Sequence, residues 1–269
     1  MKKIGSYAVL EKLGQTSTNT LYVGEHESTG KLAVLRMANT PEWNEQVTVK
    51  GGMLSSVKHS AVVEIYEQGT QRGDTGTVAY FAAEYAKGHP LQELMENHRQ
   101  VTMKEKLELL VKMCEGIHVL NGAGHVCLCT PDDVMVRDGG VKIMDVHAKL
   151  PPNLQTSARV IQTKAKRIPF WTPELIKGEN DRDRREDVFC MGLLTYLFVT
   201  GEDPFKSVIP IERAEKILAE SAPAMTTVAK DCPAALEATV MKALKKDRKL
   251  RQQSVREFGA ELRLVSAGL

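Results

Sequence analysis

The chain has 269 residues, of which 42% are hydrophobic and 26% are charged, and its formal net charge is +2. This composition is typical of an ordinary soluble globular protein, and a chain of this length can form one domain of two lobes or two small domains. The weak net charge argues against nucleic acid as the main partner. No run of about 18 apolar residues occurs, so the sequence predicts no membrane segment.

The cysteines and the N-terminal segment predict a cytoplasmic location. The chain has five cysteines, an odd number, and their spacing does not suggest a disulfide framework. The N-terminal segment carries Lys2 and Lys3 but lacks the apolar stretch of a secretory signal.

The first third of the chain has the pattern of an antiparallel sheet with one helix. Apolar and polar residues alternate over 6–37 between turn residues, which predicts a β-meander. Pro41 predicts a helix start, because proline is favoured at the first helical position. Gly51 and Gly52 each make a helix less stable than alanine would, by about 0.8–1.0 kcal/mol. We therefore expect this helix to be short, broken or displaced. Two further strands are predicted over 62–66 and 78–82.

The remainder is predicted to be mostly helical, with one short hairpin. Thr102 and Glu105 form the sequence pattern of a capping box at a helix start. Residues 134–136 and 141–144 are apolar strands, and the intervening Asp138-Gly139 supplies the positive φ angles that a tight hairpin turn needs. Asp145 follows the hairpin directly.

Several motifs, taken together in this order, resemble the protein kinase family and its bacterial serine/threonine members in particular. Gly14 matches the first glycine of the phosphate-binding loop, and Gly30 to Arg36 matches the strand with the phosphate-binding lysine. The hairpin followed by Asp145 matches the catalytic loop and metal-binding segment. Thr172-Pro173-Glu174 resembles the end of the activation segment, and the apolar run after Asp187 resembles the central buried helix.

The resemblance covers residues 6–266 and implies the α+β, bilobal protein-kinase-like fold. A small, mainly antiparallel β lobe with one helix and the hinge would occupy residues 1–86, and a larger helical lobe would occupy residues 87–269. Together they would form a single domain, 1–269. The resemblance also implies that Glu174 pairs with Arg251.

The family pattern further implies a nucleotide pocket, which we expect to be vestigial. Its positions are Gly14, Arg36, Glu84, Ala86, Asp133 and Asp145. Asp133 and Asp145 would be the metal ligands, because carboxylate oxygens suit Mg²⁺. The alternative is that both carboxylates only cap turns.

The catalytic positions depart from the family pattern. Counting back from Pro131, the His-Arg-Asp positions hold Val126, Cys127 and Leu128. A register shifted by one residue places Cys127 at the aspartate position instead. Neither register supplies the carboxylate that orients the substrate hydroxyl in phosphoryl transfer.

The phosphate-binding positions also differ. Arg36 stands in place of the lysine and Lys50 in place of its glutamate partner, so two like charges replace an ion pair. Thr16 and Asn19 replace the second and third loop glycines, which let backbone amides close over phosphates.

From these departures the sequence predicts that the chain is not an enzyme. It would be an inactive pseudokinase that serves as a protein-binding or regulatory scaffold, with weak or no binding of ATP and magnesium. Two alternatives stay open: a kinase-fold transferase with atypical nucleotide chemistry, and a nucleotide-sensing switch without turnover.

Two smaller clusters have both a functional and a structural interpretation. A zinc ion would accept His125, Cys127, Cys129 and His147, but a strand with buried structural thiols is the simpler interpretation. Lys164, Lys166 and Arg167 would suit an acidic or phosphorylated protein partner, or they form a solvated loop.

Overall fold

The computed structural model describes residues 3–146, 170–181 and 183–269. The chain divides into two compact units, Met1–Lys87 and Gly88–Leu269. The predicted α+β organisation, a lobe built on an antiparallel sheet and a helical lobe, is confirmed, while the assignment of 1–269 as one domain divided after residue 86 stays a prediction. In the part of the chain that the structure describes, no helix has the length and apolar character needed to cross a membrane.

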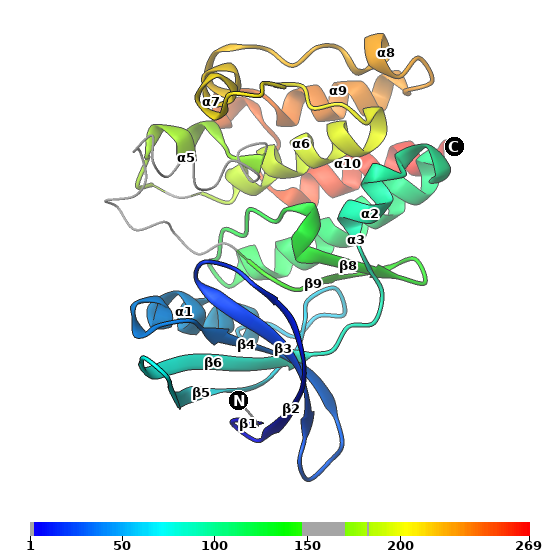
Figure 1. Ribbon diagram of the computed structural model, residues 1–269. Helices are drawn as coiled ribbons and strands as arrows, with labels where there is room; N and C mark the ends of the chain where they lie inside the picture. Colours follow the sequence, from blue (N-terminus) through cyan, green and yellow to red (C-terminus); the bar gives the residue numbers. More distant parts are fainter. Residues whose placement is uncertain (1–2, 147–169, 182) are drawn as a thin grey trace. The chain divides into compact units, whose positions relative to one another are not determined.

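The first unit is built on a six-stranded antiparallel sheet with the strand order β1-β2-β3-β4-β6-β5 (Figure 1). The predicted meander is confirmed by β2, β3 and β4. The fifth strand begins later than predicted, at Ile65, and extends to Gly73. The strands are β1 (Lys3–Ile4), β2 (Tyr7–Gln15), β3 (Asn19–His26), β4 (Leu32–Ala38), β5 (Ile65–Gly73) and β6 (Gly76–Glu84).

The helix of this unit was expected to be short, broken or displaced; it is continuous over 12 residues, so its glycines do not break it. A 3₁₀ turn, η1 (Pro41–Trp43), leads into α1 (Asn44–Ser55), which passes through both glycines. At Gly51 an added Cβ would lie 2.6 Å from Gln68 Oε1 and 3.1 Å from Phe81 Cδ1. The missing side chain thus lets α1 lie close against the sheet, and this packing offsets the low helix propensity.

The second unit is mainly helical, with a small three-stranded sheet. The predicted capping box is present: Glu105 N donates to Thr102 Oγ1, and Thr102 N donates to Glu105 Oε2. Its elements are β7 (His89–Pro90), α2 (Leu91–Glu96), η2 (His98–Gln100), α3 (Met103–Gly122), η3 (Pro131–Asp133), β8 (Val134–Arg137), β9 (Gly140–Ile143), α5 (Pro173–Lys177), α6 (Arg185–Thr200), α7 (Pro210–Ala219), α8 (Met225–Val228), α9 (Ala234–Ala243), η6 (Arg248–Leu250) and α10 (Val255–Ala267).

The core of the second unit forms where α3, α6, α9 and α10 pack together (Figure 1). Fourteen of the sixteen residues of α6 are buried, so this helix is enclosed on all sides. Two glycines permit the closest approaches between helices. An added Cβ would lie 2.9 Å from Ala243 Cβ at Gly192, and 2.9 Å from Cys114 Cβ at Gly259.

Candidate functional site

The β8–β9 hairpin brings the two predicted metal ligands to the same end of one strand pair. Val134 pairs with Ile143, and Met144 N donates to the carbonyl of Asp133 over 2.7 Å. Asp133 therefore lies just before the start of β8, and Asp145 lies just after the end of β9, at the same end of the hairpin. The predicted hairpin is confirmed, with positive φ angles of 50° and 69° at Asp138 and Gly139.

Both carboxylates are buried and each takes part in a local turn. Asp133 Oδ2 accepts hydrogen bonds from Thr130 N at 2.8 Å and Thr130 Oγ1 at 2.7 Å. Asp145 Oδ1 accepts one from Val146 N at 2.8 Å. These contacts fit the turn-capping role considered from the sequence. They also fix the carboxylates in place, as a metal site requires.

The loop that precedes the hairpin is hydrogen-bonded to Asp187 of α6. Asp187 Oδ1 accepts from Leu128 N at 2.7 Å and from Cys127 N at 3.0 Å. Asp187 Oδ2 accepts from Asn121 Nδ2 at 2.7 Å. Leu128 has a φ of 47°, a value that non-glycine residues rarely adopt. The buried carboxylate therefore fixes a strained turn at the predicted catalytic positions.

The cysteine thiols around this turn have raised pKa values and are therefore protonated. The pKa of Cys127 is raised well above its usual value, by a hydrogen bond with Cys129 and by burial. Burial and the charge of Asp187 raise the pKa of Cys190 in the same way. The sequence placed the Cys127–Cys129 pair on a strand, but these residues lie in the irregular loop. All three thiols, of Cys127, Cys129 and Cys190, are buried and form part of the core.

The zinc alternative finds no support in the described residues. Among residues 3–146, 170–181 and 183–269, no group of three or more His, Cys, Asp or Glu side chains is placed to hold a metal ion. His147, the fourth proposed ligand, lies outside these ranges, as do Lys164, Lys166 and Arg167 of the predicted basic patch.

In the first unit, the predicted phosphate-loop residues make a closed β2–β3 turn. Thr16 Oγ1 accepts from Thr18 N at 3.2 Å and from Asn19 N at 3.1 Å, and the Asn19 side chain is buried. Gly14 lies on β2 with no atom within 4 Å of an added Cβ. Thr16 and Asn19 thus stabilise the turn with their own polar groups.

The remaining predicted pocket residues of this unit lie on β4, α1 and at the end of β6. The Arg36 guanidinium lies over the Phe81 ring, 5.7 Å from its centroid, and Lys50 is buried on α1. Ala86 N donates to the carbonyl of Glu84 over 3.1 Å, which makes a tight turn after β6. The roles of these residues in nucleotide binding stay predictions.

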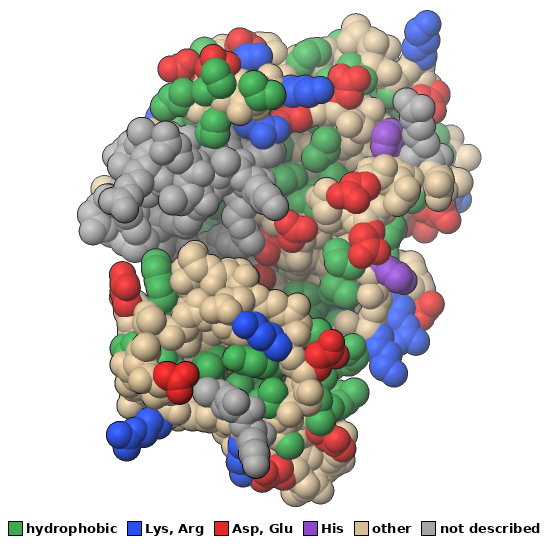
Figure 2. Space-filling model, in the orientation of Figure 1, with side chains coloured by type: hydrophobic (Ala, Val, Ile, Leu, Met, Phe, Trp, Pro, Cys, Tyr) green, Lys and Arg blue, Asp and Glu red, His purple; other side chains and the backbone are tan. Residues whose placement is uncertain are grey.

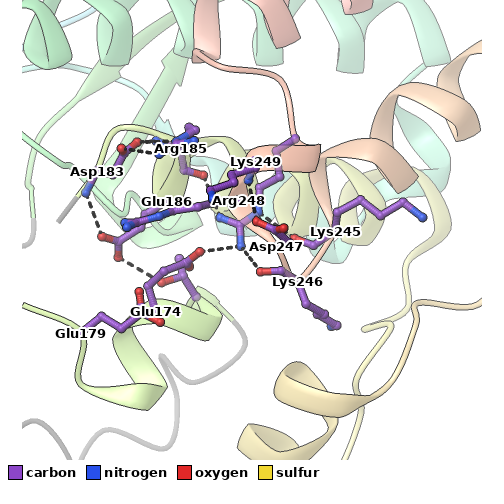
Figure 3. A network of polar contacts seen from close by, with 12 residues as sticks. Glu174, Glu179, Asp183, Arg185, Glu186, Lys245, Lys246, Asp247, Arg248 and Lys249 are labelled. Carbon is purple, nitrogen blue, oxygen red and sulfur yellow. Dashed lines mark hydrogen bonds and ion pairs between the residues drawn. The ribbon is translucent and has the colours of Figure 1, made fainter. Parts of the chain in front are cut away.

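The predicted Glu174–Arg251 pair is confirmed as the centre of a buried network (Figure 3). Arg251 Nη2 lies 2.7 Å from Glu174 Oε1, and the two side chains are only 0% and 4% exposed. Arg251 also donates to three backbone carbonyl groups, those of Lys245, Arg185 and Lys246. Burial lowers the pKa of the Arg251 guanidinium, and Glu174 opposes this effect. The pair ties α5 to the segment before α10.

Sequence reasoning missed other members of these networks. Thr172 Oγ1 donates to Glu186 Oε2 over 3.0 Å, between two buried side chains. Asn121 was also not predicted; its side-chain amide donates to Asp187 and to the backbone carbonyl of His125. Its position as a polar residue near the end of the predicted apolar helix face was the available signal.

Comparison with known proteins establishes the family. The model of the protein kinase domain matches residues 7–258, so the chain belongs to the protein kinase family. The chain is 27% identical over 271 residues to a protein of Corynebacterium glutamicum named "Probable serine/threonine-protein kinase PknB", with 98% of this chain and 41% of that protein covered. It is 27% identical over 221 residues to "Serine/threonine-protein kinase PknB" of Mycobacterium tuberculosis, with 80% and 34% covered.

A third relative, from Streptomyces coelicolor, is also named a probable serine/threonine-protein kinase. It is 25% identical over 270 residues, which cover 96% of this chain and 39% of the relative. The chain thus spans about two-fifths of the length of such relatives. The kinase domain of Mycobacterium tuberculosis PknI has the same fold, with a TM-score of 0.73, 18% identity, and 97% of both chains covered.

These relatives overturn one prediction. The sequence predicted that the chain is not an enzyme. Cys127 or Leu128 stands where the family has its catalytic aspartate, Arg36 stands in place of the phosphate-binding lysine, and the glycine-rich loop is incomplete. Relatives named as serine/threonine protein kinases match 80–98% of the chain, which places it in an enzyme family. The prediction was wrong because substitutions at single positions were taken as evidence against an activity that the family as a whole carries.

Proposed function

We propose that this kinase-family domain acts as a regulatory module that binds a protein partner. The observation that carries the proposal is an exposed apolar segment at the start of α7, formed by Val208, Ile209 and Ile211. Val208 is 95% exposed, and the two isoleucines are exposed as well. Hydrophobic side chains gather at α7 in Figure 2. Contiguous exposed apolar side chains are typical of a protein-binding surface.

Local contacts hold this apolar segment in one conformation. Ser207 Oγ donates to Glu212 Oε2 and accepts from Ile209 N. An ion pair between Arg213 and Asp203 joins α7 to the preceding loop. A rigid surface loses little conformational entropy on binding, which favours association.

A cytoplasmic location accompanies this proposal, because all five cysteines are free thiols, as expected in a reducing compartment.

A second candidate function is that of a transferase or nucleotide sensor that binds a metal–nucleotide complex. The observation that favours it is the placement of Asp133 and Asp145 at one end of the β8–β9 hairpin. Two fixed carboxylates fit a magnesium ion, which takes hard oxygen ligands and shares its coordination with nucleotide phosphates. Such a complex would supply the phosphoryl group for transfer.

A complementation experiment separates the two functions. The gene is deleted in its own organism, and the resulting growth or signalling defect is rescued with variants. We expect Asp145→Ala to rescue and Val208→Asp to fail, because a charge on the apolar segment opposes burial by a partner. Leu264→Asp is the matched control, since Leu264 is 76% exposed on α10. The two surface variants, Val208→Asp and Leu264→Asp, should keep the melting temperature of the wild type, whereas Asp145→Ala removes a buried turn cap and must be checked for folding before its rescue is scored.

The opposite pattern would reject the proposal. Rescue by Val208→Asp together with failure of Asp145→Ala would show that the metal–nucleotide site carries the function. In that case a phosphoryl-transfer assay with labelled ATP and Mg²⁺ or Mn²⁺ should give a signal that Asp145→Ala abolishes.

A further inference from the structure

Asn39 joins the β2–β3 turn, residues 16–19, to the end of β4. It follows β4 directly, and its side chain is hydrogen-bonded at both ends. Its Nδ2 donates to the backbone carbonyl of Thr16 over 2.8 Å, and its Oδ1 accepts from the hydroxyl group of Thr20 over 2.7 Å. Its backbone amide donates to the carbonyl of Thr18 over 3.0 Å. One residue thus holds the turn at its start, at its tip and at its exit into β3.

The backbone amides of the turn are bonded within the turn itself. Those of Thr18 and Asn19 donate to Thr16 Oγ1 over 3.2 Å and 3.1 Å. The amide of Thr16 donates to the carbonyl of Asn19 over 2.8 Å. A backbone turn binds an anion through amides that point toward it. In the closed conformation these three amides are therefore not available to a phosphate group.

The closed turn also contains an unfavourable feature. The Asn19 residue is only 5% exposed, and its Oδ1 has no hydrogen-bond partner among the residues that the structure describes. A buried acceptor without a partner costs free energy. The contacts of Asn39 oppose this cost, so the closed conformation depends on them.

We propose that Asn39 is an autoinhibitory latch, which holds the β2–β3 turn closed against a polyphosphate ligand. Release of the Thr16 carbonyl and the Thr20 hydroxyl lets the turn open, and its amides then become free for phosphate oxygens. The same strand supplies positive charge, because Arg36 lies on β4 three residues before Asn39 and is paired with Leu21 of β3. The latch lies in the first unit and acts independently of the protein-binding role proposed for α7.

The latch sets the affinity through the fraction of molecules in which the turn is open. A ligand that binds only the open conformation has an apparent affinity that is reduced by that fraction. Asn39→Ala removes both side-chain hydrogen bonds and keeps the backbone one. We expect it to raise the open fraction about tenfold, which corresponds to about 1.4 kcal/mol and to the net loss of two hydrogen bonds. Amide exchange and polyphosphate affinity should therefore increase by the same factor.

Hydrogen exchange of the whole chain measures the opening, under conditions where the exchange rate reports the opening equilibrium. The turn amides of Asn39→Ala should exchange about tenfold faster than those of the wild type. Asn44→Ala is the matched control in the same unit. The Asn44 side chain donates to the Thr77 carbonyl over 2.9 Å and accepts from the Ala79 amide over 2.6 Å, so it too loses two hydrogen bonds. This control should leave exchange of the turn at the wild-type rate.

Binding is measured by titration with tripolyphosphate at constant ionic strength, followed by NMR. Asn39→Ala should bind about tenfold more tightly than the wild type, and Asn44→Ala should bind like the wild type. Thr20→Val removes only one contact of the latch and keeps the shape of the side chain. It should give a smaller increase of both exchange and affinity, and it tests the latch even where Asn39→Ala fails to fold.

Three results would overturn the proposal. Unchanged exchange of the turn in the latch variants would show that Asn39 does not hold it closed. Faster exchange without tighter binding would show that these contacts serve only the stability of the turn. Equal gains in Asn39→Ala and Asn44→Ala would show a general loosening of the first unit.

Discussion

At the scale of single residues, the Glu174–Arg251 pair is the contact with the largest predicted effect on stability. Both side chains are almost fully buried, and Arg251 satisfies three backbone carbonyls besides the carboxylate. Removing one partner leaves a buried charge without compensation. We expect Arg251→Ala to lower the free energy of unfolding by about 3–5 kcal/mol, measured by urea denaturation of the whole chain.

The matched control for this prediction is an exposed pair with the same distance between the charged atoms. Arg263 Nη2 lies 2.7 Å from Glu115 Oε1, but these side chains are 60% and 47% exposed. Solvent screens such a pair, so Arg263→Ala should change the free energy of unfolding by less than about 1 kcal/mol. Equal effects of the two substitutions would show that burial does not set the strength of the Glu174–Arg251 contact.

At the scale of the elements, sequence patterns predicted structure wherever the cause is local. The hairpin depends on Asp138 and Gly139, whose positive φ angles are a property of the turn itself. The start of α3 depends on a capping box within four residues. The Glu174–Arg251 contact is not local, and it was predicted only through the resemblance to a family.

Where the cause lies in distant contacts, the sequence patterns were insufficient. The continuity of α1 depends on contacts of Gly51 with the sheet, and propensity alone favours a break. The loop at Cys127–Cys129 alternates like a strand, but Asp187 of α6 binds its backbone amides and imposes a positive φ at Leu128. Neither contact is visible in the local sequence.

The two adjacent glycines of α1 provide a matched test of this explanation. At Gly52 no atom lies within 4 Å of an added Cβ, so Gly52→Ala should raise the free energy of unfolding by about 0.8–1.0 kcal/mol through helix propensity. At Gly51 the added methyl group meets Phe81, which is buried and fixed. Overpacking typically costs about 1–3 kcal/mol, so Gly51→Ala should be destabilising by about 1 kcal/mol after the gain in propensity.

Urea unfolding of the two variants beside the wild type gives these values directly. Stabilisation of both variants by the same amount would mean that α1 has space above the sheet at Gly51. In that case the continuity of the helix would need a cause other than close packing.

At the scale of the whole molecule, the proposed regulatory role implies weak nucleotide binding. Thr16 and Asn19 fill the β2–β3 turn with side chains that bond to its own backbone, where glycines would leave amides exposed to phosphate. We expect ATP with Mg²⁺ to bind with a Kd weaker than about 1 mM, a free energy of only about −4.1 kcal/mol.

A thermal-shift series followed by calorimetry measures this affinity, with ATP, ADP and tripolyphosphate, each with and without Mg²⁺ or Mn²⁺. Tripolyphosphate is the control, because it carries the charge without adenine. Shifts that are equal for ATP and tripolyphosphate and disappear with added salt would indicate attraction by basic side chains alone. Micromolar binding of ATP that needs the metal and is lost in Asp145→Ala would contradict the expectation. It would establish the hairpin carboxylates as a metal–nucleotide site and favour the transferase or sensor function.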